Sequence, residues 1–175
     1  MKILNKISIR KIKLGVDDHE NFIQKLITWD RKKYFSSLEV PINLFNLYYD
    51  LYGIYQETEL VGVSALRLEA LPHYYLGIPD WDQVVLYPLE FQFALHPHFD
   101  DLVTREIVFQ HLEEEVFPNY LYSELKMCLM NVDSEMRAFL DHHHFSLKET
   151  DKRGNAIYCL PQEREKIKIR SIYCG

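Results

Sequence analysis

The spacing of apolar residues changes several times in the first half of the chain, and each spacing indicates an element. Residues 6–14 alternate between apolar and polar side chains, which predicts a first strand. Apolar residues then recur every three or four positions over 22–27, after Asp17 and Asp18, which predicts a helix capped by an aspartate. A second helical pattern covers 41–51 and begins with a proline, which suits a first helical turn.

A hairpin and two loops are predicted around this second helix. Segments 51–55 and 59–66 are rich in β-forming residues and flank the short polar turn 56–58, a pattern typical of an antiparallel hairpin. The polar segment 31–40 indicates a loop or a helix tail. Segment 71–83 combines aromatic residues with proline and glycine, and it predicts a loop that either lies on the surface or faces a substrate.

The second half of the chain alternates strands with helices. Pro88 cannot donate to a sheet ladder, so an edge, a bulge or a strand start is expected within the strand candidate 84–95, and its regular part is 89–95. The remaining elements are a helix over 102–117, a strand over 122–130, a helix from Asp133 to just before Phe145, and a final hairpin of 145–150 with 156–160.

Composition and charge narrow the class of protein. The chain has 175 residues, enough for one domain with a buried core, and its 47% hydrophobic content excludes a disordered protein. A net charge of −6 argues against a general nucleic-acid binder, and no apolar run approaches the roughly 18 residues of a membrane span. Cys128, Cys159 and Cys174 are widely spaced, which suits reduced thiols. We therefore expect a cytoplasmic protein that binds neither nucleic acid nor membrane.

Three stretches of the sequence resemble one protein family. They are LYGIYQETELVGVSALRLE, which has the cadence of a hairpin, LEFQFALHPHF, a strand ending in an apolar-x-Pro-x-aromatic step, and the helix DSEMRAFLDHHHF. Together with the element order, they are similar to the GNAT superfamily of N-acetyltransferases. The resemblance implies a single mixed α/β domain over 1–175. Its sheet would be twisted and mostly antiparallel, with helices on both faces and a splayed parallel pair formed by 89–95 and 122–130.

The resemblance also implies acetyl-CoA as cosubstrate. In the family, backbone groups of the central strand hold the pantetheine arm, and the loop and helix after that strand bind the pyrophosphate. In this chain, the residues at the positions that hold the arm are Phe93, Ala94, Leu95 and His96, and those at the phosphate positions are Thr104 and Arg105. For Arg105, the alternative interpretation is a solvent-exposed helix residue.

The phosphate loop departs from the family pattern, which is Gln/Arg-x-x-Gly-x-Gly/Ala. The matching window, 100–105, has aspartate, valine and arginine at the three signature positions. Asp100 and Asp101 suit a helix cap, but a capping carboxylate and a bound phosphate compete for the same N–H groups. The sequence therefore leaves two hypotheses open: an acyl-CoA-dependent N-acyltransferase, or a catalytically inactive GNAT-fold module that binds a ligand or partner.

For a transferase, the resemblance implies a general base on the central strand and a small-molecule or protein amine as acceptor. Glu90 is the first candidate for the base, with a structural carboxylate as the alternative, and His96 is the second, because imidazole titrates near neutral pH. The family's acid, a tyrosine, aligns with Leu140, so Tyr120 or Tyr122 would have to replace it.

The histidine tract 142–144 suggests a metal site, but consecutive side chains on a helix diverge by about 100°. On that argument they do not share one ion, and we predict no metal. The basic segment 165–173 suits a further strand, added to the chain's own sheet or to a neighbour's in a homodimer.

Overall fold

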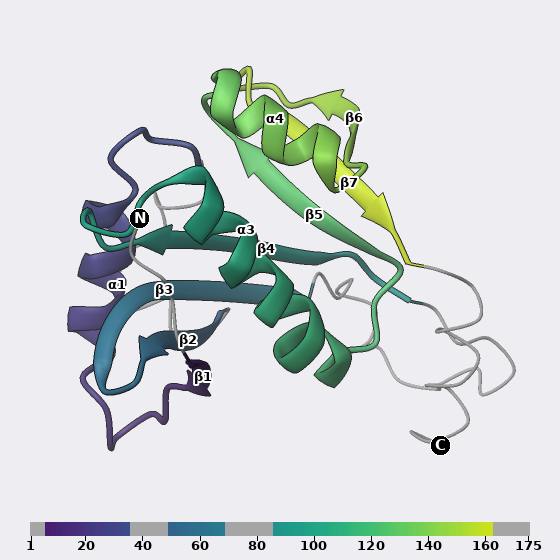
Figure 1. Ribbon diagram of the computed structural model, residues 1–175. Coiled ribbons are helices and arrows are strands. Elements are labelled where there is room, and N and C mark those ends of the chain that lie inside the picture. Colours follow the sequence, from purple (N-terminus) through teal and green to yellow (C-terminus); the bar gives the residue numbers. More distant parts are fainter. Residues whose placement is uncertain (1–5, 36–48, 69–85, 163–175) are drawn as a thin grey trace, which may run out of the picture.

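The computed structural model describes residues 6–35, 49–68 and 86–162. Residues 41–48 of the helix predicted over 41–51, the loop 71–83, the strand 165–173 and Cys174 lie outside these residues. Figure 1 shows the elements of the described part. They are β1 (Ile7–Lys11), α1 (His19–Trp29), β2 (Asp50–Gln56), β3 (Glu59–Leu68), β4 (Leu89–Leu95), α3 (Leu102–His111), β5 (Glu124–Leu129), α4 (Ser134–His142), β6 (Ser146–Thr150) and β7 (Ala156–Pro161).

The strands form one seven-stranded sheet in the order β1-β2-β3-β4-β5-β7-β6. All neighbours are antiparallel except β4 and β5, which run parallel and are connected through α3. The mixed, mostly antiparallel sheet with one parallel pair is therefore confirmed. Along the two strands, the parallel ladder contains Leu89 with Leu125 and Glu90 with Lys126, and beyond that point the strands separate (Figure 1).

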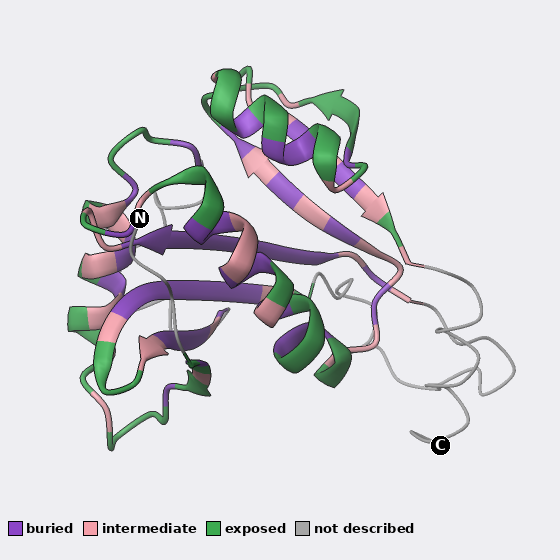
Figure 2. Cartoon of the chain, in the orientation of Figure 1, coloured by how far each residue is buried: buried purple, intermediate pink, exposed green. Residues whose placement is uncertain are grey.

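Helices cover both faces of the sheet, and each face has its own core. Strand β4 is buried along its whole length (Figure 2). Its odd-numbered residues, such as Phe91 and Phe93, join the aromatic core beneath α3 and α4. Ala94 points the other way and packs with Ile23 and Leu26 of α1. A central strand buried on both faces is what positions the backbone and side chains of β4 at the middle of the molecule.

Aspartates begin the three α-helices of the described residues, as the sequence predicts. Each carboxylate accepts an N–H of the first helical turn, and this satisfies a donor that has no partner within the helix. The pairs are Asp18 with Asn21 (3.1 Å), Asp101 with Thr104 (2.8 Å) and Asp133 with Met136 (2.9 Å).

Two predicted boundaries are wrong. The helix predicted over 102–117 is α-helical only to His111, and a π-helical turn, Leu112–Val116, and a 3₁₀ turn, Phe117–Asn119, complete it. The wider turn places Leu112, Val116 and Phe117 in the core together, and Pro118 prevents the helix from continuing. Leu51, assigned above to the end of a helical pattern as well as to the hairpin, lies in β2 and pairs with Ala65.

The aromatic core beneath α3 generates a prediction. The Phe109 ring lies 5.7 Å from Phe91, 5.1 Å from Phe139 and 6.1 Å from Phe145, centroid to centroid. We expect Phe109→Ala to lower the free energy of unfolding by about 3–5 kcal/mol in urea denaturation. Val103→Ala, on the same helix but 55% exposed, should change it by less than about 0.5 kcal/mol. A similar effect of both substitutions would contradict this description of the core.

Candidate functional site

The gap between β4 and β5 is filled by residues of the chain itself. Phe35 forms an isolated antiparallel bridge with Leu129 of β5, and the Met130 N–H donates to the Tyr34 carbonyl at 2.7 Å. Strand β7 already pairs with one edge of β5, so Phe35 lies on the other edge, the one that β4 has left. The Phe35 ring lies 6.4 Å from the ring of Phe93 on β4. We call residues 30–35 the plug segment.

The plug segment is folded around one buried carboxylate. Asp30, 4% exposed, accepts the N–H groups of Tyr34 and Phe35, both at 3.1 Å. Burial raises the pKa of Asp30, while the two N–H donors act in the opposite direction. The Lys33 N–H also donates to the Asp30 carbonyl at 3.0 Å, and Lys33 adopts a left-handed backbone conformation with φ of 53°. These bonds close a tight turn that presents Tyr34 and Phe35 to the gap.

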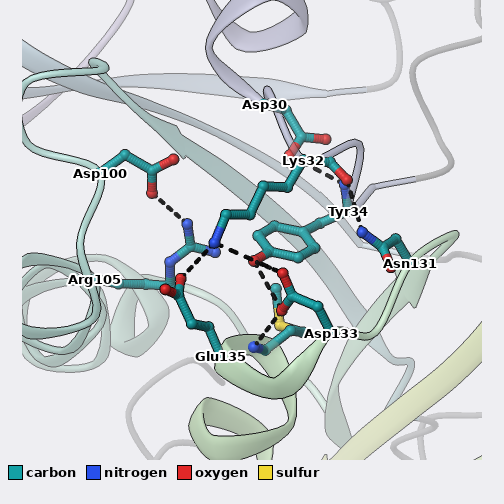
Figure 3. A network of polar contacts seen from close by, with 9 residues as sticks. Asp30, Lys32, Tyr34, Asp100, Arg105, Asn131, Asp133 and Glu135 are labelled. Atoms are coloured by element: carbon teal, nitrogen blue, oxygen red, sulfur yellow. Dashed lines mark hydrogen bonds and ion pairs between the residues drawn. The ribbon is translucent and has the colours of Figure 1, made fainter.

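The same segment is attached to the far side of the gap, at the end of β5 and the start of α4 (Figure 3). The Tyr34 hydroxyl donates to the Asp133 carboxylate, whose oxygens lie at 2.8 and 3.0 Å. Lys32 pairs with Glu135 at 2.6 Å, and Asn131 donates to the Lys32 carbonyl at 2.9 Å. Tyr34 and Phe35 are 1% and 2% exposed, so the gap is closed at their position.

Two pKa shifts reflect this attachment. Burial, with the hydrogen bond to Asp133, raises the pKa of Tyr34 to about 12. For Asp133, burial by itself would raise the pKa, but the Met136 N–H, the Tyr34 hydroxyl and the charge of Lys32 outweigh it and lower the pKa. The neutral phenol and the charged carboxylate are thus the forms that the folded chain favours.

Arg105 of α3 lies on the β4 side of the gap. Its guanidinium pairs with Asp100 at 2.5 Å and lies 4.9 Å from the centre of the Tyr34 ring and 5.9 Å from that of Phe93. The Arg105 side chain is only 8% exposed, so its interpretation as a solvent-exposed helix residue is wrong. In this conformation its charge is neutralised by a carboxylate within the chain.

The first N–H groups of α3 are likewise hydrogen-bonded to acceptors within the chain. The Thr104 N–H donates to the Asp101 carboxylate, and the Arg105 N–H donates to the Asp101 carbonyl at 3.0 Å. Thr104 is 4% exposed. A phosphate at this helix start would have to displace the capping carboxylate.

The backbone of β4 offers fewer groups to the gap than the sequence suggests. The His96 N–H donates to Val61 of β3 at 2.8 Å, and alternate residues of an antiparallel pair direct their N–H and C=O groups to the same neighbour. Ala94 and His96 therefore use their backbone groups on the β3 side. Phe93 and Leu95 direct theirs towards the gap, so they are the two residues of the predicted four that are oriented to hold an extended ligand.

Glu90 lies where β4 and β5 part, and it is almost completely buried. It is 2% exposed, and its carboxylate pairs with the Arg67 guanidinium at 2.6 Å. Gln92 follows on the same face at 1% exposure, and its side-chain amide has no hydrogen-bond partner in the part of the chain that the structure describes. Glu90 and Gln92 thus form a polar strip on a strand whose opposite face is entirely apolar.

The structure does not bring the two candidate bases together. Six strand positions, about 20 Å, separate Glu90 from His96. The His96 ring lies 5.1 Å from Trp29 of α1, and its Nδ1 accepts the His98 N–H at 3.1 Å. Of the two candidate acids, Tyr120 donates its hydroxyl to Asp50 at 2.6 Å, and burial with this bond raises its pKa.

Two rings of the histidine tract approach one carboxylate, contrary to the divergence expected from helical spacing. His142 and His143 both face Glu106, at 3.9 Å from His142 Nε2 and in hydrogen-bond contact with His143 Nε2. The reason is that α4 ends at His142, and His143 adopts φ −93° and ψ 8°, outside the helix. The 100° divergence applies only while the helix continues.

The plug segment was not predicted as part of a site. Its sequence, Asp-Arg-Lys-Lys-Tyr-Phe, is locally polar and matches a surface loop. The only available signal was the aromatic pair at its end, next to an aspartate four positions earlier, and many loops share that spacing.

The bond between Tyr34 and Asp133 generates a second prediction. Tyr34→Phe should lower the free energy of unfolding by about 1.5–3 kcal/mol at neutral pH, since it removes a hydrogen bond to a charged group. Because the pKa of Asp133 is lowered, the stability linked to its charge is present above the ordinary value of 3.8 and is lost as the pH falls through the lowered pKa. The effect of Tyr34→Phe, measured by urea denaturation, should therefore shrink below about pH 3.8.

Tyr158→Phe, which alters a half-buried tyrosine of β7, is the matched control and should show no such pH dependence. A Tyr34→Phe effect that is equally large in acid would show that the hydroxyl does not depend on the charge of Asp133.

Comparison with known proteins identifies the fold. No family model matches the sequence, and the search of curated proteins gives no significant match. Among solved structures, the chain is similar to aminoglycoside acetyltransferase AAC(6')-Ib in complex with coenzyme A, with 13% identity, a TM-score of 0.60, and 95% of this chain and 99% of that one covered.

Two further structures agree. A GNAT family acetyltransferase from Elizabethkingia anophelis with acetyl-CoA bound has 13% identity and a TM-score of 0.55, covering 89% of this chain and 98% of that one. PaiA N-acetyltransferase from Thermoplasma acidophilum in complex with coenzyme A has 17% identity and a TM-score of 0.55, covering 90% and 100%. Among the described residues, no helix is both long and apolar enough to cross a membrane. The chain has the fold of the GNAT superfamily of N-acetyltransferases.

Proposed function

We propose that the protein is an acyl-CoA-dependent N-acyltransferase that moves an acetyl or related acyl group to the amine of a small molecule or a protein. The observation that carries the proposal is the separation of β4 and β5 directly after Glu90 and Lys126. It leaves the backbone groups of Phe93 and Leu95 facing a gap, with a carboxylate at its closed end. Similar structures of this fold include complexes with acetyl-CoA or coenzyme A, which supports a thioester as the ligand.

Glu90 is the residue that we propose to assist the reaction. The amine nitrogen attacks the carbonyl carbon of the thioester, so a C–N bond forms and the C–S bond breaks. The amine loses a proton, which Glu90 accepts directly or through water, and the departing thiolate takes up a proton. Arg67, at 2.6 Å, keeps the Glu90 carboxylate oriented and balances its charge. His96 remains a second candidate, at the open end of the strand.

The plug segment imposes a condition on this function. Tyr34 and Phe35 lie between β4 and β5, so an acyl-CoA does not fit the gap in this conformation. In addition, Asp101 caps the start of α3, and Asp100 pairs with Arg105. We propose that residues 31–35 withdraw when the ligand enters. The contacts that would break include the Lys32–Glu135 ion pair at the surface and the bond of the buried Tyr34 hydroxyl to Asp133. The backbone contacts of Tyr34 and Phe35 with β5 and with the Asp30 carboxylate would also be lost or rearranged.

The filled gap also favours a second candidate function. A GNAT-fold module without catalysis, which binds a partner or another ligand, needs neither an open gap nor a phosphate-binding helix start. The pairing of Asp100 with Arg105 and the closure by Phe35 both agree with it. The two candidates differ in whether any state of the protein binds acyl-CoA.

Binding of acetyl-CoA separates them, measured as a shift in thermal unfolding over a range of ligand concentrations. We expect Phe35→Ala, which empties the space beside Phe93, to bind acetyl-CoA at least about tenfold more tightly than the wild type. A ligand at one hundred times its Kd adds about 2.7 kcal/mol of stability, a shift that is easily detected. Phe145→Ala is the control, because Phe145 is also buried (6% exposed, against 2% for Phe35) but contacts Phe91 and Phe109 beneath α3.

If neither the wild type nor Phe35→Ala binds acetyl-CoA or other acyl-CoAs at millimolar concentration, the transferase proposal is overturned and the binding module remains. If binding is seen, thiol release with a panel of amines follows. Glu90→Gln keeps the shape of the side chain and should reduce the rate by about 10²–10⁴. An unchanged rate would remove Glu90 from the chemistry without affecting the binding result.

A further inference from the structure

Two imidazoles and one carboxylate converge on the surface where α3 meets the end of α4. One ligand atom each from Glu106, His142 and His143 lies within 4.8 Å of the others. Glu106 comes from the first turns of α3, His142 is the last residue of α4, and His143 follows it. This cluster is on different residues from those of the gap, and the proposed acyl transfer does not use it.

We propose that Glu106, His142 and His143 bind a divalent transition metal ion of the zinc class. Two neutral imidazoles and a carboxylate are a ligand set that zinc uses in open sites, with water in the fourth position. A tetrahedral ion with bonds of about 2.0–2.2 Å separates its ligand atoms by about 3.4 Å. The Oε2 of Glu106 lies 3.9 Å from His142 Nε2 and closer than 3.4 Å to His143 Nε2, and all three ligand atoms lie within 4.8 Å of one another, so shifts of about 1.5 Å or less would accommodate the ion.

His143 is held in an orientation that suits a ligand. Its ring lies 4.4 Å from Phe109 and 4.7 Å from Phe139, centroid to centroid, and its side chain is 15% exposed. Its other nitrogen, Nδ1, lies 3.8 Å from Glu113 Oε1. A carboxylate on that side of the ring favours a proton on Nδ1, which leaves the Nε2 lone pair for the metal. Glu113 is thus the carboxylate placed to act as the outer partner of His143 in the proposed site, at a distance that must shorten by about 1 Å to form a hydrogen bond.

His142 provides the route for the ion. Its side chain is 71% exposed, so the ion reaches the site from solvent, and the ring is free to approach Glu106. Oxygen-preferring ions such as Mg²⁺ and Ca²⁺ would find only one carboxylate among these three ligands, so the set favours zinc, cobalt, nickel or copper. The competing interpretation is a charged His143 that pairs with Glu106 and Glu113 and needs no metal.

Titration of the chelator-treated full-length protein with Zn²⁺ by calorimetry, and with Co²⁺ by visible absorption, tests the proposal. We expect saturable binding of one ion per chain, with the d–d bands of a four-coordinate Co²⁺ centre. His142→Ala should weaken the affinity by at least about tenfold, and Glu113→Gln should weaken it by about tenfold through the orientation of His143. Because His142 is exposed, its substitution is not expected to disturb the fold.

His144→Asn is the matched control. It alters the third histidine of the tract at a left-handed position, φ 62°, that asparagine tolerates, and it should leave metal affinity unchanged. Zn²⁺ binding that is equal in the wild type and His142→Ala would overturn the proposal, as would the absence of binding in the wild type. Loss of affinity in His144→Asn as large as in His142→Ala would also contradict it, because it would place the ion elsewhere on the tract.

Discussion

A strand edge needs a hydrogen-bonding partner, and this constraint explains the arrangement of the candidate site. β5 begins beside β4 but diverges from it after Lys126, while β7 covers only the opposite edge. Without the plug segment, the backbone groups near Leu129 and Met130 would have no partner from the described part of the chain on the edge of β5 that faces the gap. The plug segment supplies that partner through the bridge at Phe35 and the bond to the Tyr34 carbonyl. In a transferase, an extended pantetheine arm would compete for the same space.

The electrostatics of the gap follow the same principle. The starts of α3 and α4 both carry aspartate caps, Asp101 and Asp133, so the positive ends of these two helices already hold negative charge. The cations beside these helix starts also form ion pairs within the chain, Arg105 with Asp100 and Lys32 with Glu135. An entering phosphate must exchange partners with these carboxylates, and it gains less than it would at an empty helix start. The missing glycines and the plug segment are thus two aspects of one closed conformation.

Local patterns predicted the fold well because they record which side of each element is buried. The alternation of Leu89, Phe91, Phe93 and Leu95 and the aspartate caps are properties of short segments, and both are confirmed. The parallel pair and its splaying were expected from the family resemblance, but the filling of the gap by Tyr34 and Phe35 depends on contacts between segments far apart. Tyr34 meets Asp133 across about a hundred positions, and no local spacing encodes that contact. The same holds for His142 and His143, which the helical rule separated and which the end of α4 brings to one carboxylate, that of Glu106.

The polar strip on β4 bears on which function the closed conformation serves. A pure packing role would favour apolar residues at 90 and 92, because burying polar groups costs stability unless they are paired. Glu90 has Arg67 as its partner, but the amide of Gln92 is buried with both its donor and its acceptor unused among the described residues. That cost is local to the point where β4 and β5 part. In the proposed transferase, a polar group of the ligand or acceptor that arrives beside Glu90 would give the Gln92 amide a partner and remove this cost.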